Sequence, residues 1–411
     1  MTAVVEDIDE RIHINDLIFK LPAENQASQS RTLKRLQPDR QSFTMTDSSK
    51  DHITFILEMG DQFIDFKNSY LKFDHQNTGG GLYTWGIGSA KNLFKEIVVY
   101  HKNGLELTRL RYANIYNAHR DRRIMTAKEI KTTGGLMGYT TDFITRSIAE
   151  ASINTYIIPL AGLVDIFNTK ELFPSMLAKD LRLELHLEKP VIAMYSTSAI
   201  TSYTINNIDM VLDVHTIKPQ ILKELKVKSA SKGLELTYNG VNSLMDSIAS
   251  GVLTTNVLTS RALSQVNSGF AIYRLNSALS AFNADSMMSD YVSDMDESQW
   301  RLGSVYFPES KITDRTERYW NLLHVNQQFD EKHPPMSITP TRFIDISAGF
   351  ESANVDFRTN QDMLSGQPSN NSQVVNLYLK FLSMPSGRVI NMFVDHTIIC
   401  KIFNNNAIRL T

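Results

Sequence analysis

The sequence predicts an all-β protein made of two consecutive domains of the sandwich or barrel class. Its 411 residues are too many for one small sandwich and suit two β domains of roughly 150–200 residues each. Apolar and polar residues alternate in many short stretches, as they do where successive side chains of a strand point to opposite faces of a sheet. Turn signals separate these stretches, and helical patterns are few.

The clearest strand covers Leu181–Glu188, whose sequence is LRLELHLE. Alternation predicts that its four leucines face a core and its four polar residues face water. A shorter apolar strand before it ends at Pro159, and a compact loop carrying Phe167 and Phe173 connects the two.

Other stretches of the first domain predict particular strand features. Phe63–Phe73 is a long alternating strand, and Leu93–Tyr100 is followed by Asn103-Gly104, a strong signal for a hairpin turn. The apolar phase shifts across Asn206-Asn207, which predicts a β-bulge at that point.

Composition shifts divide the chain into four parts. Residues 1–50 are predicted to be an N-terminal arm, because residues 22–49 are polar and lack a core pattern. Residues 51–218 form the first domain, and residues 219–233, with a short helix and then small polar residues, form a linker. Residues 234–411 form the second domain.

The second domain reads as a run of short strands. Ser277–Ser298 is predicted to be a loop or short helix; its five closely spaced acids lack the spacing and glycine of a calcium loop, which favours a solvated acidic loop. The predicted strands are Thr254–Ser268, Phe270–Leu275, Phe343–Ile346, Val375–Phe381, Val389–Val394, Ile398–Ile402 and Ala407–Leu410.

One dense basic cluster occupies residues 109–131, where apolar residues recur near helical spacing. Its face would meet either a genome or a neighbouring subunit's acids, or else plain solvent. Both interpretations stay open from the sequence. The cluster comprises Arg109, Arg111, Arg120, Arg122, Arg123, Lys128 and Lys131.

Charge and cysteine content exclude several classes of protein. The net charge is −2, so the chain as a whole is no electrostatic match for nucleic acid. The single cysteine, Cys400, rules out an internal disulfide framework and lies in an alternating stretch typical of a buried structural thiol. No apolar run approaches the ~20 residues that span a bilayer, and acids within Met1–Lys20 argue against a secretory leader.

No catalytic, cofactor-binding or metal-binding residues are predicted. The ten histidines are scattered, and no nucleophile elbow, phosphate loop or zinc-protease motif occurs. A pair of carboxylates brought together from distant strands, as in a glycosidase, stays open. The expectation is a protein that is not an enzyme and carries no cofactor.

Three stretches in order, Phe63–Phe73, Tyr156–Glu188 and Arg301–Leu323, resemble double jelly-roll major capsid proteins of virophages, Polinton-like viruses and related icosahedral DNA viruses. The resemblance implies two consecutive eight-stranded jelly-roll barrels with short helices in the loops. It also implies a structural role in which three copies form a pseudo-hexagonal capsomer of an icosahedral viral shell.

The same resemblance implies the partners and the location. The partners would be other copies of the chain in the homotrimer and in neighbouring capsomers, penton and minor capsid proteins, and an internal membrane if the shell has one. The protein would be assembled inside the host cell and reside in the virion. No specific nucleic-acid binding is expected.

Two other interpretations share the fold class. The first is a β-sandwich carbohydrate-binding or glycoside-cleaving protein, which would display exposed aromatic residues beside acids in a groove. The second is a single-barrel penton or fibre-like virion part, which the two strand-rich halves argue against.

Overall fold

The computed structural model describes most of the chain in several stretches. The described residues are 28–139, 148–149, 151–169, 172–174, 181–196, 198–259, 263, 265–288, 295–326, 338–344, 351–359, 366–367, 374–384, 386–403 and 406–409. Within them, no helix has both the length and the apolar character needed to cross a bilayer.

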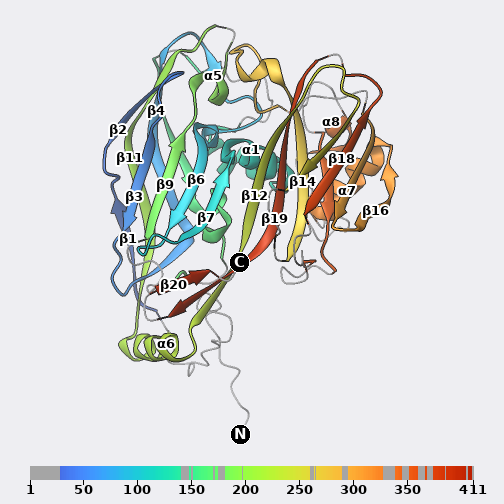
Figure 1. Ribbon diagram of the computed structural model, residues 1–411. Coiled ribbons are helices and arrows are strands. Elements are labelled where there is room, and N and C mark those ends of the chain that lie inside the picture. The colour runs from blue at the N-terminus through green and yellow to red at the C-terminus, as the bar shows by residue number, and fades with distance from the viewer. Residues whose placement is uncertain are drawn as a thin grey trace.

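The first half of the chain folds into two facing antiparallel sheets (Figure 1). One has the order β1-β11-β4-β8, with β2 also paired to β11, and the other has the order β3-β9-β6-β7. A two-stranded ladder of β5 and β10 lies apart from them. The strands are β1 (Ser28–Leu36), β2 (Ser42–Thr46), β3 (His52–Leu57), β4 (Phe63–Gly79), β5 (Tyr83–Thr84), β6 (Phe94–Tyr100), β7 (Glu106–Arg111), β8 (Ile153–Pro159), β9 (Leu181–Leu187), β10 (Tyr195–Ser196) and β11 (Ser202–Ile217).

The second half repeats the arrangement. Its sheets have the orders β12-β19-β14-β17, with β20 paired to β19, and β13-β18-β15-β16. The strands are β12 (Leu234–Ile248), β13 (Thr254–Leu258), β14 (Val266–Leu275), β15 (Met295–Leu302), β16 (Val305–Ile312), β17 (Ala353–Asp356), β18 (Val375–Phe381), β19 (Arg388–Phe403) and β20 (Asn406–Arg409).

Both halves share one topology. To compare the halves, the eight strands of each barrel are numbered from one to eight in chain order, from β2 to β11 without β5 and β10, and from β12 to β19. In each half, one sheet then joins the first, eighth, third and sixth strands. The other sheet joins the second, seventh, fourth and fifth strands in each half. This is the jelly-roll order of two interleaved Greek keys. The predicted pair of eight-stranded jelly rolls is therefore present.

The helices lie in the connections between strands. Both α1 and α7 follow the fifth strand of their barrel and precede the sixth, so the two helices occupy equivalent places. The α-helices are α1 (Ala113–Ile124), α2 (Ala127–Lys131), α3 (Thr133–Leu136), α5 (Pro190–Ala193), α6 (Pro219–Ser231), α7 (Arg315–Val325) and α8 (Pro340–Ile344).

Two apolar clusters form the core. The larger fills the first barrel and continues into the junction with the second, where it includes Tyr238, Phe270 and Phe393. The smaller fills the second barrel around Trp300 and Met392. Because the larger cluster crosses from one half to the other, the two barrels share apolar packing as well as a covalent link.

Several predicted features are confirmed. The leucines of β9 are buried at alternate positions, and β6 and β7 pair as a hairpin around Gly104, whose φ is +79°. In β11, the three-residue step from Asn206 to Asp209 opposes a two-residue step in β4, and Asn207 has φ +49°. The extra residue is the predicted bulge.

The predicted arm needs correction over residues 28–46. These residues form β1 and β2, and both strands pair with β11. In β2, Phe43 and Met45 are buried although the surrounding sequence is polar. Two apolar residues at alternate positions are enough to seat a five-residue strand, and a composition average over the arm conceals them. Residues 1–27 lie outside the described part.

Other strand predictions are also corrected. Residues 340–344 form α8, where Pro340 occupies the first helical turn. The strand predicted for residues 343–346 is therefore wrong at Phe343 and Ile344, and residues 345–346 lie outside the described part. The predicted strands Val389–Val394 and Ile398–Ile402 are parts of one long strand, β19. Glu188, predicted to face water, is buried and accepts a hydrogen bond from Asn114 Nδ2 at 3.0 Å.

The helix α6 lies in the predicted linker region and connects the two halves (Figure 1). Lys226 on α6 pairs with Asp61 of the first barrel at 2.9 Å, and Ser229 Oγ donates to the Ile402 carbonyl at 3.1 Å. The helix therefore contacts the turn between β3 and β4 in the first half and β19 in the second. The exact domain limits stay a prediction.

Candidate functional site at the junction of the two barrels

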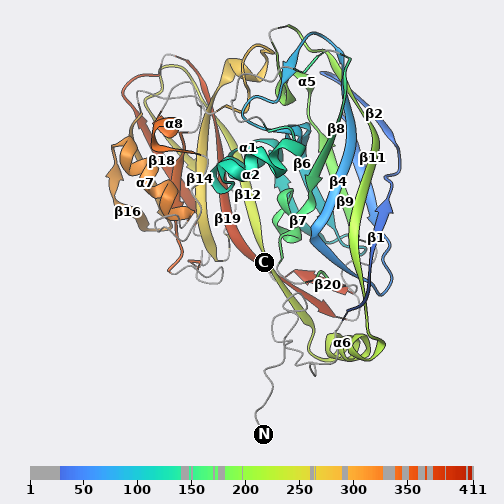
Figure 2. The same ribbon diagram turned by 180° about the vertical axis from the view of Figure 1, so that it is seen from behind.

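The basic cluster that the sequence singled out contributes its helix to the junction. The helix α1 runs between the strands of the first barrel and β14 of the second in both views (Figures 1 and 2). Arg120, Arg122 and Arg123 are 9%, 1% and 6% exposed. Both interpretations of this face are therefore wrong for these three arginines: it meets neither a genome or a neighbouring subunit's acids nor plain solvent.

The remaining members of the cluster lie elsewhere. Arg109 and Arg111 belong to β7, not to a helix, and both interact with Glu96 on the neighbouring strand. Lys128 and Lys131 are exposed on α2. The seven basic residues that the sequence grouped are thus divided among a strand, a buried helix and an exposed helical turn.

Arg120 joins α1 to the loop after β8. Its Nη1 contacts Asp165 Oδ1 at 2.8 Å, and its Nη2 donates to the Gly162 carbonyl at 2.7 Å. The guanidinium carbon lies 5.3 Å from the centre of the Tyr116 ring. A buried arginine needs such partners because an uncompensated charge in a low-dielectric interior is costly.

A second buried ion pair lies beside it. Lys91 Nζ contacts Asp121 Oδ2 at 2.6 Å and donates to the Gly162 carbonyl at 2.8 Å. Tyr139 also donates to Asp121 Oδ2, at 2.9 Å. Burial lowers the pKa of Lys91, while the carboxylate of Asp121 opposes that shift.

The network extends into the second barrel. Arg123 Nη1 donates to Asn354 Oδ1 at 3.1 Å, and its guanidinium carbon lies 3.6 Å from the centre of the Phe270 ring. Tyr116 donates to Asp395 Oδ1 at 3.2 Å, and Asn239 Nδ2 donates to Asp165 Oδ2 at 3.1 Å. Side chains of α1 and its neighbours thus fix the second barrel against the first.

Burial governs the titration of these groups. It raises the pKa of Asp395, with a further contribution from the nearby Asp165 carboxylate, and it lowers the pKa of Arg123 to about 10. Burial also lowers the pKa of His119 to about 3, and its Nε2 lies 2.8 Å from the Met287 carbonyl. A neutral histidine that donates to a carbonyl is a structural element of this interior.

A cluster with metal-ligand character occurs in the first barrel. Asp65, Asp213 and His215 can place one ligand atom each within 4.8 Å of one another, and all three are buried. The guanidinium of Arg31 already contacts both oxygens of Asp213, with Nη2 at 2.7 Å from Oδ2. Asp65 accepts from Lys67 N at 3.1 Å and Asn68 Nδ2 at 2.8 Å. The cluster therefore suits an arginine better than a metal ion.

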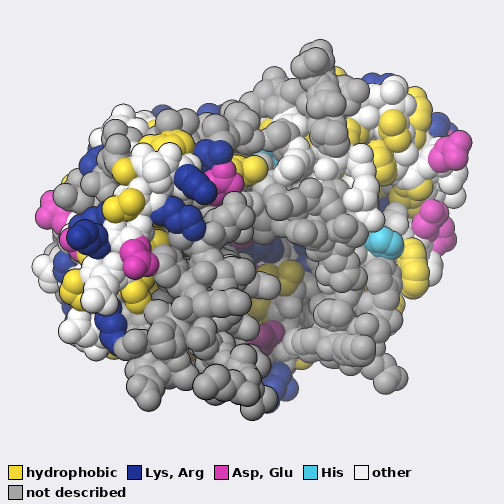
Figure 3. Space-filling model, turned by 90° about the horizontal axis from the view of Figure 1, so that it is seen from below, with side chains coloured by type: hydrophobic (Ala, Val, Ile, Leu, Met, Phe, Trp, Pro, Cys, Tyr) yellow, Lys and Arg dark blue, Asp and Glu magenta, His cyan; other side chains and the backbone are white. Residues whose placement is uncertain are grey.

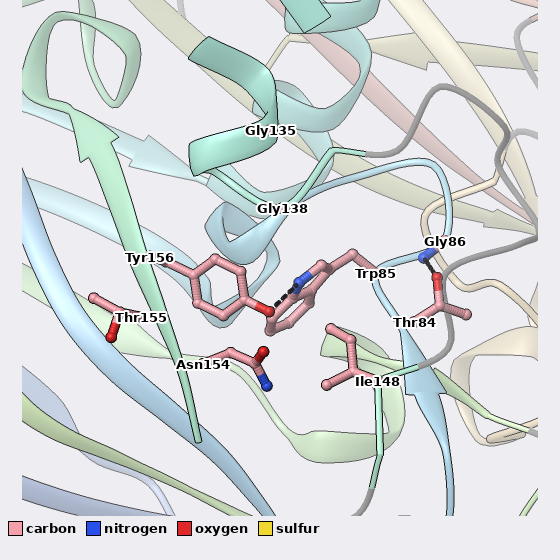
Figure 4. A pocket seen from close by; sticks show the side chains of 9 residues that line it. All are labelled: Thr84, Trp85, Gly86, Gly135, Gly138, Ile148, Asn154, Thr155 and Tyr156. Atoms are coloured by element: carbon pink, nitrogen blue, oxygen red, sulfur yellow. Dashed lines mark hydrogen bonds between the residues drawn. The ribbon is translucent and has the colours of Figure 1, made fainter. Parts of the chain in front are cut away.

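A small pocket lies at the edge of β8, and Figure 4 shows its lining. Trp85 Nε1 donates to Tyr156 Oη at 3.1 Å across one side of the pocket. Its volume is about 120 Å³, below the roughly 300–1,000 Å³ of sites that enclose small-molecule ligands. The lining residues are Thr84, Trp85, Gly86, Gly135, Gly138, Ile148, Asn154, Thr155 and Tyr156.

The three described acids of residues 285–297, Asp285, Asp296 and Glu297, do not gather into one site. Asp285 is held against the first barrel, where Oδ2 accepts from Ile87 N at 2.8 Å. Asp296 and Glu297 both contact Lys380 on β18, at 2.6 and 2.9 Å. Asp290 and Asp294 lie outside the described residues. For the three described acids, the predicted solvated loop is replaced by ion pairs and backbone contacts.

On the face seen from below, the described side chains show no uniform basic field (Figure 3). Lys and Arg side chains there are interspersed with acidic and apolar ones, over the part of the chain that is described (Figure 3).

The single cysteine, Cys400, is buried, as predicted.

Comparison with solved structures identifies the architecture. No family model matches this sequence, and no curated protein matches it either. The PBCV-1 virus capsid protein superimposes with a TM-score of 0.65 at 10% identity, covering 94% of this chain and 98% of that one. The Faustovirus major capsid protein superimposes with a TM-score of 0.64 at 10% identity, covering 96% of this chain and 93% of that one.

A virophage protein shares the architecture as well. The mavirus major capsid protein gives a TM-score of 0.52 at 11% identity, covering 95% of this chain and 92% of that one. Together with the repeated strand order, these matches confirm the double jelly-roll fold and the structural likeness to the capsid proteins that the sequence resembled.

Proposed function

We propose that this chain is a major capsid protein, the repeating structural subunit of an icosahedral viral shell. One observation carries the proposal: two jelly rolls of the same strand order account for nearly the whole chain. Chains with that architecture and almost the same extent are capsid proteins of PBCV-1 and Faustovirus. Chains that share only a fold can differ in function, so an assembly experiment is required.

The finer proposal is a homotrimer that forms a pseudo-hexagonal capsomer. Three copies would supply six similar barrels, and six similar barrels approximate sixfold symmetry. The buried network of Arg120, Arg123 and Asp395 supports this, because it holds the two barrels of one copy in a fixed relation. A shell needs that rigidity, since errors in the angle between barrels would accumulate across neighbouring capsomers.

The remaining parts of the proposal concern partners. In a shell the protein would contact neighbouring capsomers, penton and minor capsid proteins and, where one is present, an internal membrane. It would be assembled inside the host cell and reside in the virion. Specific nucleic-acid binding and enzymatic activity are not part of the proposed role.

Size-exclusion chromatography with light scattering tests the oligomer. Permanent interfaces bury roughly 2,000–5,000 Å² in total, so we expect a particle of three times 46.6 kDa that persists on dilution to micromolar concentration. A stable monomer that binds glycans would contradict the proposal and favour a carbohydrate-binding sandwich.

A further inference from the structure

The strand β1 is attached to the first barrel without contributing a buried side chain. Over residues 29–36 every side chain is exposed or half-buried, and Leu33 is 64% exposed. The next strand on the same neighbour, β2, inserts Phe43 and Met45 into the core. The barrel core therefore holds β2 firmly, whereas β1 depends on backbone pairing, on its polar side chains and on the half-buried Leu36, which packs against the core.

Three basic side chains supply that polar attachment. Arg31 contacts Asp213 through Nε and Nη2, at 2.9 and 2.7 Å. Arg35 Nη1 lies 3.1 Å from Asp209 Oδ2, and Lys34 Nζ donates to the Glu58 carbonyl at 3.0 Å. Charge-assisted hydrogen bonds of this kind fix both the strand and its register.

The receiving edge of β11 is built for a guanidinium. The Asp213 side chain is fully buried, and Asp65 lies within 4.8 Å of it. The Asp213 backbone N–H donates to Ser69 Oγ on β4 at 2.9 Å. These groups belong to β4 and β11, so the acidic edge persists whether or not β1 is in place.

The chain is anchored immediately after β1. Pro38 is buried, Asp39 N donates to the Thr54 carbonyl at 3.3 Å, and Arg40 pairs with Asp51. Detachment of β1 would therefore pivot near Gln37 and leave the rest of the barrel unchanged.

We infer that the β11 edge over Met210–Ile217 is an acceptor site for a basic extended segment, and that β1 of a second copy of this chain occupies it by strand exchange. A second copy carries the identical segment, so exchange replaces every contact by an equal one. Strand addition gives affinity through backbone hydrogen bonds and specificity through side-chain sites. The inference rests on the proposed function in one respect: a viral shell would hold copies of the chain close enough together for β1 to exchange.

A cysteine pair across the two strands tests the exchange. Thr32 on β1 lies opposite Val214 on β11, and opposed antiparallel residues have Cα separations that suit a disulfide. One chain carries Thr32→Cys and a separate chain carries Val214→Cys, and the two are mixed at high concentration in an oxidising glutathione buffer. The native Cys400 is buried and gives little background.

We expect a disulfide-linked pair of one chain with the other on a non-reducing gel, confirmed by mass spectrometry of the joined peptides. A chain carrying both substitutions is the control for strand geometry and should close a disulfide. If the doubly substituted chain closes its link while the mixed chains stay unlinked, exchange between copies is ruled out. No shell is needed, so this failure would leave the proposed capsid role standing.

Charge recognition is tested in the same mixture. Adding Arg31→Asp to the Thr32→Cys chain and Asp213→Arg to the Val214→Cys chain places like charges at this contact in each closed chain. Exchange alone restores an opposite-charge pair at both sites, so the yield of linked pairs should rise at least several-fold. Lys50→Gln is the matched control, because Lys50 is exposed and lies outside β1, and it should leave the yield unchanged. A yield no higher than that of the Lys50→Gln mixture would contradict the role of the Arg31 guanidinium.

Discussion

Leu183 and Arg182 are neighbours in β9 with opposite environments. Leu183 is fully buried, whereas the Arg182 side chain is 49% exposed beside Glu184. Leu183→Asp should lower the free energy of unfolding by several kcal/mol, because it places a charge in an apolar core. Arg182→Asp should cost about 1 kcal/mol or less, as a change at an exposed ion pair. Urea denaturation of both variants measures the difference, and similar losses would show that the strand phase is wrong.

His75 gives the stability a defined pH dependence. Burial lowers its pKa to about 3, against about 6.5 in the unfolded chain. Between these values the unfolded state binds the additional proton, so stability is complete above pH 6.5 and falls as the pH drops toward 3. The slope from this group is at most about 1.4 kcal/mol per pH unit.

The variant His75→Phe isolates that contribution. It removes the titrating ring and the 2.9 Å contact with Tyr83 Oη, so it should be less stable near neutral pH. Its stability should then fall less steeply than that of the wild type between pH 6 and pH 4. His119, whose pKa burial also lowers, makes the stability fall with falling pH in the same way. Asp285 and Asp395, whose pKa values burial raises, make the stability rise as the pH falls. Parallel curves for the two proteins would contradict the assignment to His75.

At the scale of elements, α1 acts as a structural bridge. Arg120→Ala would leave the Asp165 carboxylate without its cationic partner, and breaking a buried ion pair in this way typically costs about 3–5 kcal/mol. Lys128→Ala, on exposed α2, should change the free energy of unfolding by less than about 0.5 kcal/mol. Denaturant titrations of the two variants provide the comparison. Equal, small effects would mean that the arginines of α1 are solvated after all.

The elements differ in how far the sequence determines them. Leu181–Leu187 and the Asn206-Asn207 bulge were predictable, because strand alternation and its interruption are local patterns. The burial of Arg120 and Arg123 was not, because their partners Asp165 and Asn354 are distant in sequence. The strand β2 was hidden for another reason, since Phe43 and Met45 are two apolar residues in a polar stretch.

The same division applies to the junction site. Local spacing predicted a helix within residues 109–131, and α1 lies there, although Arg109 and Arg111 belong to β7. Spacing alone does not show what covers a helix. A signal was present in Tyr116, Ala118 and Ile115, which lie among the arginines and are buried with them. When basic and apolar residues occur on every side of a helix, the helix has no distinct polar face to expose to water. Such a helix is better interpreted as surrounded by protein.

At the scale of the whole molecule, charge predicts weak binding to duplex DNA. The net charge is −2, and the arginines of α1 are enclosed. We expect dissociation constants no tighter than roughly 10⁻⁴–10⁻⁶ M at physiological salt. A fluorescence anisotropy titration of the wild type and of a Lys128→Ala/Lys131→Ala variant tests this, since both lysines are exposed. Nanomolar binding that this variant loses would contradict the prediction.

The architecture of the assembled product tests the central claim most directly. Electron microscopy of the purified protein, under conditions in which it assembles, should show closed shells tiled by pseudo-hexagonal capsomers. Each capsomer should contain three copies and therefore six barrels, with the two barrels of a copy related as in the isolated chain. Monomers that never tile, or capsomers built from any other number of copies, would contradict the account.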